Sequence, residues 1–208
     1  MKALLLKDFL AMKSQLKMII TILLLFIAVS FFLQDSFYLV LSIFIFGTIQ
    51  VTASFTYDEM SHWDLYANTL PLEKSEIVKS KYILSLLLSI GTLLLFSPIL
   101  LLINYWTNGI PLIDFLPIIC LMATGSLIIM SFLLPIYIKF GPQKGRLFLF
   151  LIVILPIIGF NASLSFILDK LPPVETLQKL SYVSPIFGAI LFILSYMLSV
   201  KFYETKEF

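Results

Sequence analysis

Six long stretches of the chain are apolar and carry almost no charge, at about residues 18–34, 36–57, 82–103, 115–138, 147–168 and 184–203. Each is close to the roughly 20 residues that an α-helix needs to cross the ~30 Å hydrocarbon core of a bilayer. The stretches are apolar on all sides, as expected for helices that face lipid. The pattern therefore predicts an all-α polytopic membrane protein with six transmembrane helices, formed by residues 1–208 as a single transmembrane domain.

The composition excludes a soluble protein. Apolar residues make up 60% of the chain and charged residues 12%. Soluble domains carry about 45–50% apolar and about 25% charged residues. A chain of this length could not hide so much apolar surface from water, so lipid must be its main solvent.

The basic residues predict the orientation of the spans. Twelve of the fourteen Lys and Arg side chains lie before the first span, between spans 2 and 3, between spans 4 and 5, or at the C-terminal end. The opposite side carries Lys170 and Lys179. Because basic residues concentrate on the cytoplasmic side of membrane proteins, both termini are expected to be cytoplasmic.

Residues 1–17 are predicted to form an amphipathic helix. The spacing of the apolar residues puts Leu5, Phe9, Met12 and Leu16 on one face. The borders of that face carry the basic residues Lys2, Lys13 and Lys17. The opposite face carries the polar residues Lys7, Asp8 and Ser14. Such a helix is expected to lie in the cytoplasmic interface, with its ammonium groups toward lipid phosphates. The alternative is a simple topological anchor for the first span.

The longest predicted cytoplasmic loop covers residues 58–80. Met60, Trp63, Ala67 and Leu70 share one helical face in this segment. Asp58 and Glu59 suit a helix N-terminus, where carboxylates meet the positive end of the helix dipole, and Pro71 should end the helix. A second helix is expected to begin near Glu73 or Ser75 and to continue into the third span.

Two interpretations of this loop are open. It is a docking surface for a cytoplasmic partner, or it is a solvated turn that lies on the headgroups. Its length favours docking, because a chain that only needs to turn around can do so in a few residues, as at 34–36. An external segment at 169–183 carries Val174, Leu177 and Leu180 at spacings of three after Pro173, and it predicts a short amphipathic helix before the last span.

Several chemistries are absent from the sequence. There is no phosphate-binding Gly-rich loop ending in Lys and Ser or Thr, so no ATPase site is expected in this chain. Cys120 and His62 are the sole Cys and His, so neither a metal site nor a bound cofactor is expected, and the nearly neutral net charge of +2 argues against nucleic acid. Gln50, Thr52, Asn161 and Ser163 are polar within spans; they line a pathway or join helices.

The arrangement resembles the permease subunits of the ABC-2 superfamily of bacterial exporters, in particular the small separate-chain permeases of Firmicutes. The most specific segments are Tyr57-Asp58-Glu59, Trp63, Thr69-Leu70-Pro71-Leu72 and the run from Glu76 to Tyr82. They are similar to the pattern of that family's first cytoplasmic loop. A departure is Leu72-Glu73-Lys74, where the family often has Ser-Arg after Leu-Pro.

The resemblance implies a multi-pass subunit of the bacterial plasma membrane that is not itself an enzyme. A separate P-loop ATPase subunit binds ATP and magnesium, and a second permease, of the same or a different chain, completes the exporter. Carried over to this loop, the coupling helix that docks the ATPase comprises Asp58, Glu59, His62, Trp63, Asp64, Tyr66, Leu70 and Pro71. Exporters of phenol-soluble modulins and lantibiotic resistance systems suggest amphipathic peptides or antimicrobial compounds as cargo.

Two other functions remain open at this point. One is a six-helix substrate-binding membrane subunit of an importer, although the bulky first span, with Ala28 and Ser30 as its small residues, counts against it. The other is a regulatory membrane protein without a transport role. Such a protein would tolerate scrambling of the loop between residues 57 and 72.

Overall fold

The computed structural model describes residues 2–13, 16–33, 50–67, 69–71, 73–106, 115–168 and 173–205. Within these ranges the chain forms helices and turns and no strand, as the sequence predicted. The helices are α1 (Lys2–Met12), α2 (Leu16–Leu33), α4 (Trp63–Ala67), α5 (Lys74–Trp106), α6 (Phe115–Leu168) and α7 (Val174–Glu204). A further helical segment, residues 50–60, leads toward α4.

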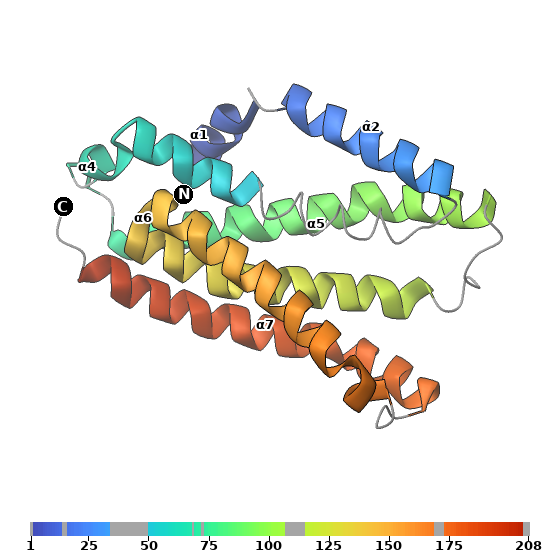
Figure 1. The fold of residues 1–208 in the computed structure, drawn as a ribbon. Coiled ribbons are helices and arrows are strands. Elements are labelled where there is room, and N and C mark those ends of the chain that lie inside the picture. Colours follow the sequence, from blue (N-terminus) through green and yellow to red (C-terminus); the bar gives the residue numbers. More distant parts are fainter. Residues whose placement is uncertain are drawn as a thin grey trace.

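The helices form an elongated bundle (Figure 1). α5, α6 and α7 run along its length, and α2 lies along α5 near the other end from α4. α1, α4, the start of α5 and the end of α7 gather at one end, which we call the α4 end. A hydrogen bond from Lys74 Nζ to the Glu204 carbonyl oxygen, at 3.1 Å, joins the first residue of α5 to the last of α7 there.

Among the residues that the structure describes, three helices are long and apolar enough to cross a membrane: Lys74–Leu102, Phe115–Leu149 and Glu175–Glu204. A shorter apolar helix, Ile20–Leu33, lies in the first predicted span. The second predicted span, 36–57, falls largely outside the described residues. The chain is therefore an integral membrane protein, and the number of six spans and their orientation stay predictions.

Two apolar clusters hold the bundle together. At the α4 end, buried residues of segment 50–60, α4, α5, α6 and α7 pack on one another, with Leu133, Leu134 and Tyr137 of α6 among the most buried. Toward the other end, α2 packs Ile22, Phe26 and Ile27 against a second cluster: Phe96, Leu100, Phe115 and Met122. Lipid surrounds the spans, so close packing rather than exclusion from water is what associates these helices.

Hydroxyl groups bridge the three long helices. Tyr82 Oη of α5 hydrogen-bonds Ser195 Oγ at 2.6 Å and Ser199 Oγ at 2.7 Å on α7. Further pairs join Ser89 to Ser126 and Thr124 to Ser184, each at 2.8 Å. In a membrane, such side chains find no water and must satisfy one another, so they fix the register of α5, α6 and α7.

Hydroxyl groups also compensate for two prolines inside helices. Pro135 and Pro185 each lack the N–H that would bind the carbonyl four residues earlier. Ser195 of α7 donates to the Ser131 carbonyl at 2.6 Å, and Ser184 donates to the Ser181 carbonyl at 2.8 Å. Serine and threonine side chains commonly satisfy backbone groups freed in this way.

α7 differs from the sequence prediction. An external helix within 169–183 and a separate span at 184–203 were expected, but residues Val174–Glu204 form one continuous helix that contains Pro185. Pro173 stands at the N-cap position, as the favoured place of proline predicts. The helix passes through Pro185 because the Ser184 hydroxyl binds the carbonyl that the proline leaves free.

α6 is two helices with a sharp reversal at Gly141. Its backbone at Gly141 has φ 78° and ψ 171°, a region open essentially to glycine alone. The chain turns back on itself there (Figure 1), and helix resumes at Pro142, a favoured first helical residue. The connection between the fourth and fifth predicted spans, residues 139–146, is therefore much shorter than expected. Gly145 then lies against Tyr137, where an added Cβ would come within 2.9 Å of the ring.

We expect Gly141→Ala to destabilise the protein by about 1–3 kcal/mol through backbone strain alone. A Cβ at Gly141 would meet nothing within 4 Å, so no steric clash contributes. Gly91→Ala is the matched control, because that site is also open and lies inside α5, where alanine is the better helix former. Thermal unfolding of the purified variants in detergent measures both. Equal midpoints for the two variants would contradict a strained turn at Gly141.

Candidate functional site

The loop that follows the second predicted span forms the surface of the α4 end. Segment 50–60 is followed by a turn at residues 61–62, in which His62 has a positive φ of 50°, and then by α4. The expected continuous helix from Asp58 to Leu70 is therefore wrong. Met60 is 74% exposed and Ala67 is 1% exposed, so the two do not share one face.

The break also reverses the expected position of two carboxylates. Asp58 and Glu59 lie in the last turn of segment 50–60, rather than at the N-terminus of a helix. Carboxylates are unfavourable at a helix C-terminus, where the dipole is negative. Two lysines offset this at Asp58: Lys7 of α1 and Lys81 of α5 both form ion pairs with it.

These lysines belong to a group of four charged residues that we call the ion quartet: Lys7, Asp8, Asp58 and Lys81. Lys81 Nζ lies 2.9 Å from Asp8 Oδ1, and Lys7 Nζ lies 3.2 Å from the same oxygen. Lys81 also donates a hydrogen bond to Ser54 Oγ at 2.7 Å. The quartet has two positive and two negative charges, and it ties α1, segment 50–60 and α5 together.

The ion quartet is largely buried. Asp8 is 1% exposed and Lys81 is 5% exposed, while Lys7 lies at the surface edge. Buried charges are costly unless they are paired, and the removal of one partner leaves the other charge uncompensated. Asp8 Oδ2 has no hydrogen-bond partner among the described residues, so this carboxylate depends on the contacts of its other oxygen.

The burial of Asp8 corrects the predicted orientation of α1. The residues that α1 buries are Leu4, Asp8 and Met12, which recur every four positions. Of the predicted apolar stripe, Leu5 is half-buried and Phe9 is 48% exposed, while the side chain of Leu16 lies outside the description. Lys13 and Lys17 are exposed. The helix turns Asp8 inward because Lys81 offers it a buried counter-charge.

Trp63 lies at the junction of α1 and α4. Lys7 Nζ stands 4.0 Å from the centre of the Trp63 ring, and the ring of Tyr66 lies 5.5 Å away. A lysine over an indole face is a favourable cation–π contact. Trp63 is half-buried, so its ring holds α4 against α1.

The outer face of α4 is different, because it exposes large apolar side chains. Leu65 and Tyr66 are each 57% exposed. Of the other predicted docking residues, Glu59, His62 and Pro71 are exposed, Leu70 is half-buried, and the side chain of Asp64 is outside the description. We call Leu65 and Tyr66 of α4, together with the exposed Met60 at the end of segment 50–60, the α4 surface.

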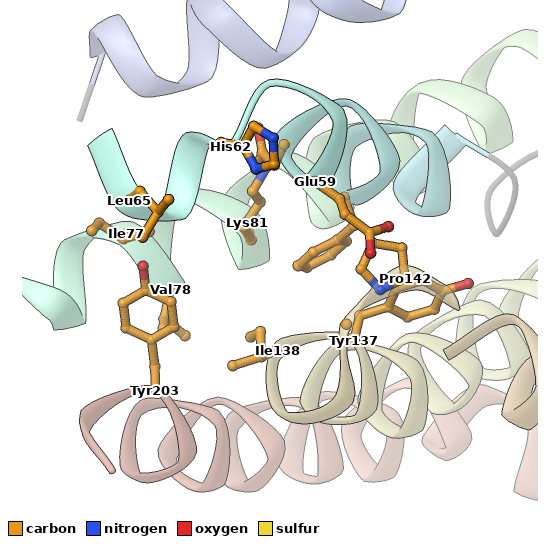
Figure 2. A pocket seen from close by; sticks show the side chains of 13 residues that line it. Glu59, His62, Leu65, Ile77, Val78, Lys81, Tyr137, Ile138, Pro142 and Tyr203 are labelled. Atoms are coloured by element: carbon orange, nitrogen blue, oxygen red, sulfur yellow. The ribbon is translucent and has the colours of Figure 1, made fainter. Parts of the chain in front are cut away.

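A pocket of about 220 Å³ lies beneath the turn (Figure 2). Figure 2 shows Glu59, His62 and Leu65 on one side of it, with Tyr137, Ile138 and Tyr203 of α6 and α7 on the other. Its remaining lining residues come from segment 50–60, α5 and the Gly141 turn: Phe55, Asp58, Ile77, Val78, Lys81, Gly141 and Pro142. The pocket therefore lies between the loop and residues of α5, α6 and α7.

The polar residues predicted to line a pathway or to join helices are not among the described residues of this site. Gln50 and Thr52 are half-buried in segment 50–60, and the side chains of Asn161 and Ser163 lie outside the description. Among the residues that the structure describes, no group of three His, Cys, Asp or Glu side chains could hold a metal ion. Among the residues described at the α4 end, the ion quartet is thus the main group of interacting charged side chains.

The sequence matches the profile of the ABC-2 family transporter proteins over residues 3–204. The chain belongs to the ABC-2 transporter family. As a member, it is a membrane permease component of an ABC transporter, and its family works together with an ATP-binding subunit. The curated proteins contain no match to this chain, and neither do the solved structures.

Sequence analysis of this ABC-2 permease missed Lys7, Asp8 and Lys81 as site residues. Lys81 stands two residues after the exposed Lys79, and nothing in the local pattern tells the two lysines apart. One signal was available: Leu4, Asp8 and Met12 repeat at spacings of four, which places a carboxylate in the middle of an apolar face. A charge in such a position calls for a buried partner.

Proposed function

We propose that this chain is the transmembrane permease subunit of an ATP-binding-cassette exporter. It moves amphipathic or hydrophobic cargo, peptides above all, out of the cell across the bacterial plasma membrane, with both termini in the cytoplasm. A separate ATPase subunit binds ATP and magnesium and supplies the energy. A second permease, of the same or a different chain, completes the pathway.

The α4 surface carries this proposal. It presents exposed Leu65 and Tyr66 on a short helix at one end of the bundle, beyond the apolar body of the spans. Exposed tyrosine and leucine on a short helix suit a protein partner, since aromatic residues are enriched at the centres of interfaces. The family membership supplies the class of that partner, an ATP-binding subunit.

The ion quartet supports a mechanical connection between this surface and the spans. α4 rests on α1 through Trp63 and Lys7, and Lys7 continues through Asp58 to Lys81 in α5. A movement of the ATPase against α4 is therefore passed on to α5 through these partly buried ion pairs. Such a movement can shift the permease between two states if ATP changes how tightly the ATPase binds each of them.

The composition of the spans supports apolar or amphipathic cargo. α5 carries no charged side chain after Lys81, and no Asp, Glu, Lys or Arg occurs in 115–138. Proton-coupled carriers need ionisable groups at such depths. A pathway lined by apolar and hydroxyl side chains suits a peptide with an apolar face.

Co-purification tests the proposal. The tagged chain, extracted from its native membrane in mild detergent, is expected to bring a stoichiometric P-loop ATPase with it. After reconstitution into vesicles, amphipathic peptides are expected to stimulate ATP hydrolysis by the complex, and a hydrophilic peptide of equal length is the control. A chain that purifies alone with a tightly bound small molecule would instead indicate the substrate-binding subunit of an importer.

A further inference from the structure

A second cavity, of about 470 Å³, lies between α6 and α7 on the outside of the bundle. We call it the α6–α7 groove. Its lining is almost wholly apolar, with a single charged residue, Lys139: Phe132, Pro135, Ile136 and Phe140 on α6, and Leu191, Leu194, Leu198 and Phe202 on α7, with Ser131 and Ser195 at its base. The volume is typical of a site for a small organic molecule.

The groove opens toward lipid. Both helices that line it are membrane-spanning by length and hydropathy. Phe132, Leu194 and Leu198 are 54%, 56% and 46% exposed, although they are large apolar side chains. Such exposure on a membrane span means contact with acyl chains, so the groove is filled from the bilayer.

The length of the groove matches one leaflet. It extends from Ser131 to Phe140 on α6 and from Leu191 to Phe202 on α7. At 1.5 Å per helical residue these stretches are about 14 and 17 Å long, close to half of the ~30 Å hydrocarbon core. An extended acyl chain of one leaflet therefore fits along it.

Lys139 lies at the end of the groove nearest the Gly141 turn. Its Nζ stands 4.5 Å from the centre of the Phe202 ring and 5.3 Å from that of Phe140. Phenylalanine rings on α6 and α7 thus hold an exposed ammonium group where the apolar lining ends. A lipid whose chain fills the groove would place its phosphate at this height, since lysine stems follow apolar surface and carry their charge to the headgroups.

We propose that the α6–α7 groove binds an anionic glycerophospholipid, with one acyl chain between the two helices and the phosphate paired with Lys139. Apolar lining, leaflet length and charge at the headgroup end all point to the same occupant. A bound lipid would fill the groove between α6 and α7, where Pro135 forms part of the lining. It would therefore support the helix pair that carries the Gly141 turn.

Retention of defined lipids tests this proposal. The protein is reconstituted into nanodiscs with equal parts of phosphatidylglycerol and phosphatidylcholine and then released into mild detergent. Native mass spectrometry counts the lipids that remain bound. The wild type is expected to retain about one phosphatidylglycerol per chain, in preference to phosphatidylcholine. Lys139→Gln should lower that preference about ten-fold, the usual effect of losing one charge-assisted contact.

Two further variants separate the groove from the surface. Lys144→Gln removes an exposed lysine beyond the Gly141 turn, outside the groove, and should leave the preference unchanged. Leu198→Trp fills the groove and should reduce retention of both lipids. Lys139 is exposed, so Lys139→Gln is compatible with folding even if Leu198→Trp is not. Size-exclusion profiles show whether each of the two variants is folded.

The proposal is overturned if Lys139→Gln retains phosphatidylglycerol as the wild type does, or if Lys144→Gln loses it equally, because the attraction would then be a general surface effect. It is also overturned if a second copy of the chain covers the groove. In a Cys120→Ser background, Leu194→Cys would then cross-link between two chains in the membrane. Absence of that cross-link, together with the loss in Lys139→Gln, supports the lipid.

Discussion

Lys81→Met is expected to lower the free energy of unfolding by about 3–5 kcal/mol, the usual cost of removing one partner of a buried ion pair. Lys81 pairs with both Asp8 and Asp58 and is 5% exposed. Without it, Lys7 alone faces two carboxylates. Thermal unfolding in detergent should show the midpoint falling by roughly 10 °C.

Lys79→Met is the matched control for this variant. Lys79 is exposed on the same helix, two residues away, so its loss should change the midpoint by little. A double-mutant cycle of Lys81→Met with Asp8→Asn adds a direct test of contact. The two changes together should cost at least about 1 kcal/mol less than the sum of the single changes. Additive losses would show that the ion pair contributes nothing to stability.

Tyr66→Ala is expected to weaken binding of the ATPase subunit about 30-fold, which corresponds to the ~2 kcal/mol of a central interface residue. Tyr66 is 57% exposed and its ring lies 5.5 Å from that of Trp63, so its truncation should lower the thermal midpoint of the permease far less than Trp63→Ala does. Titration of the purified ATPase onto the reconstituted permease measures the loss. Leu65→Ala, at the neighbouring exposed position, should act in the same direction.

Two comparisons sharpen this second prediction. Tyr105→Ala removes another exposed tyrosine, 81% exposed at the far end of α5, and should not change ATPase binding. Trp63→Ala should lower both binding and thermal stability, because the half-buried Trp63 ring packs against Lys7 and Tyr66. If Tyr66→Ala binds the ATPase as the wild type does, the α4 surface is not the docking site, whatever the family.

The structure changes which residues of the loop at 58–80 are expected to bind the ATPase. From the sequence, Trp63 was one of eight residues assigned to the docking surface, and tryptophan is a residue type enriched at interface hot spots. In the structure its ring belongs to the contact between α1 and α4. The exposed residues of the loop that can meet a partner include Leu65 and Tyr66 on the outer face of α4, Met60 before the turn, and the polar Glu59 and His62.

Hydropathy was sufficient to predict the helical membrane protein. An apolar run of about 20 residues has no other stable arrangement in lipid, because every backbone N–H and C=O must be satisfied within the helix. The first residues of α5 and α7 were also predictable from two prolines with fixed backbone geometry. Pro71 separates α5 from the helix before it, and Pro173 stands directly before α7. The family likeness of the first cytoplasmic loop rested on residues that are adjacent in the chain.

The partner of Asp8, the break at His62 and the tightness of the reversal at Gly141 could be known only from the tertiary structure. Asp8 is polar by every sequence scale, and it is buried because Lys81, 73 residues away, meets it between helices. The continuity of α7 through Pro185 is supported, by contrast, by a local contact, because the Ser184 hydroxyl binds the Ser181 carbonyl three residues earlier. Local sequence determines which segments enter the membrane, because transfer free energy is a property of each residue. Which polar groups meet inside depends on side chains from distant segments, and only the assembled bundle brings those together.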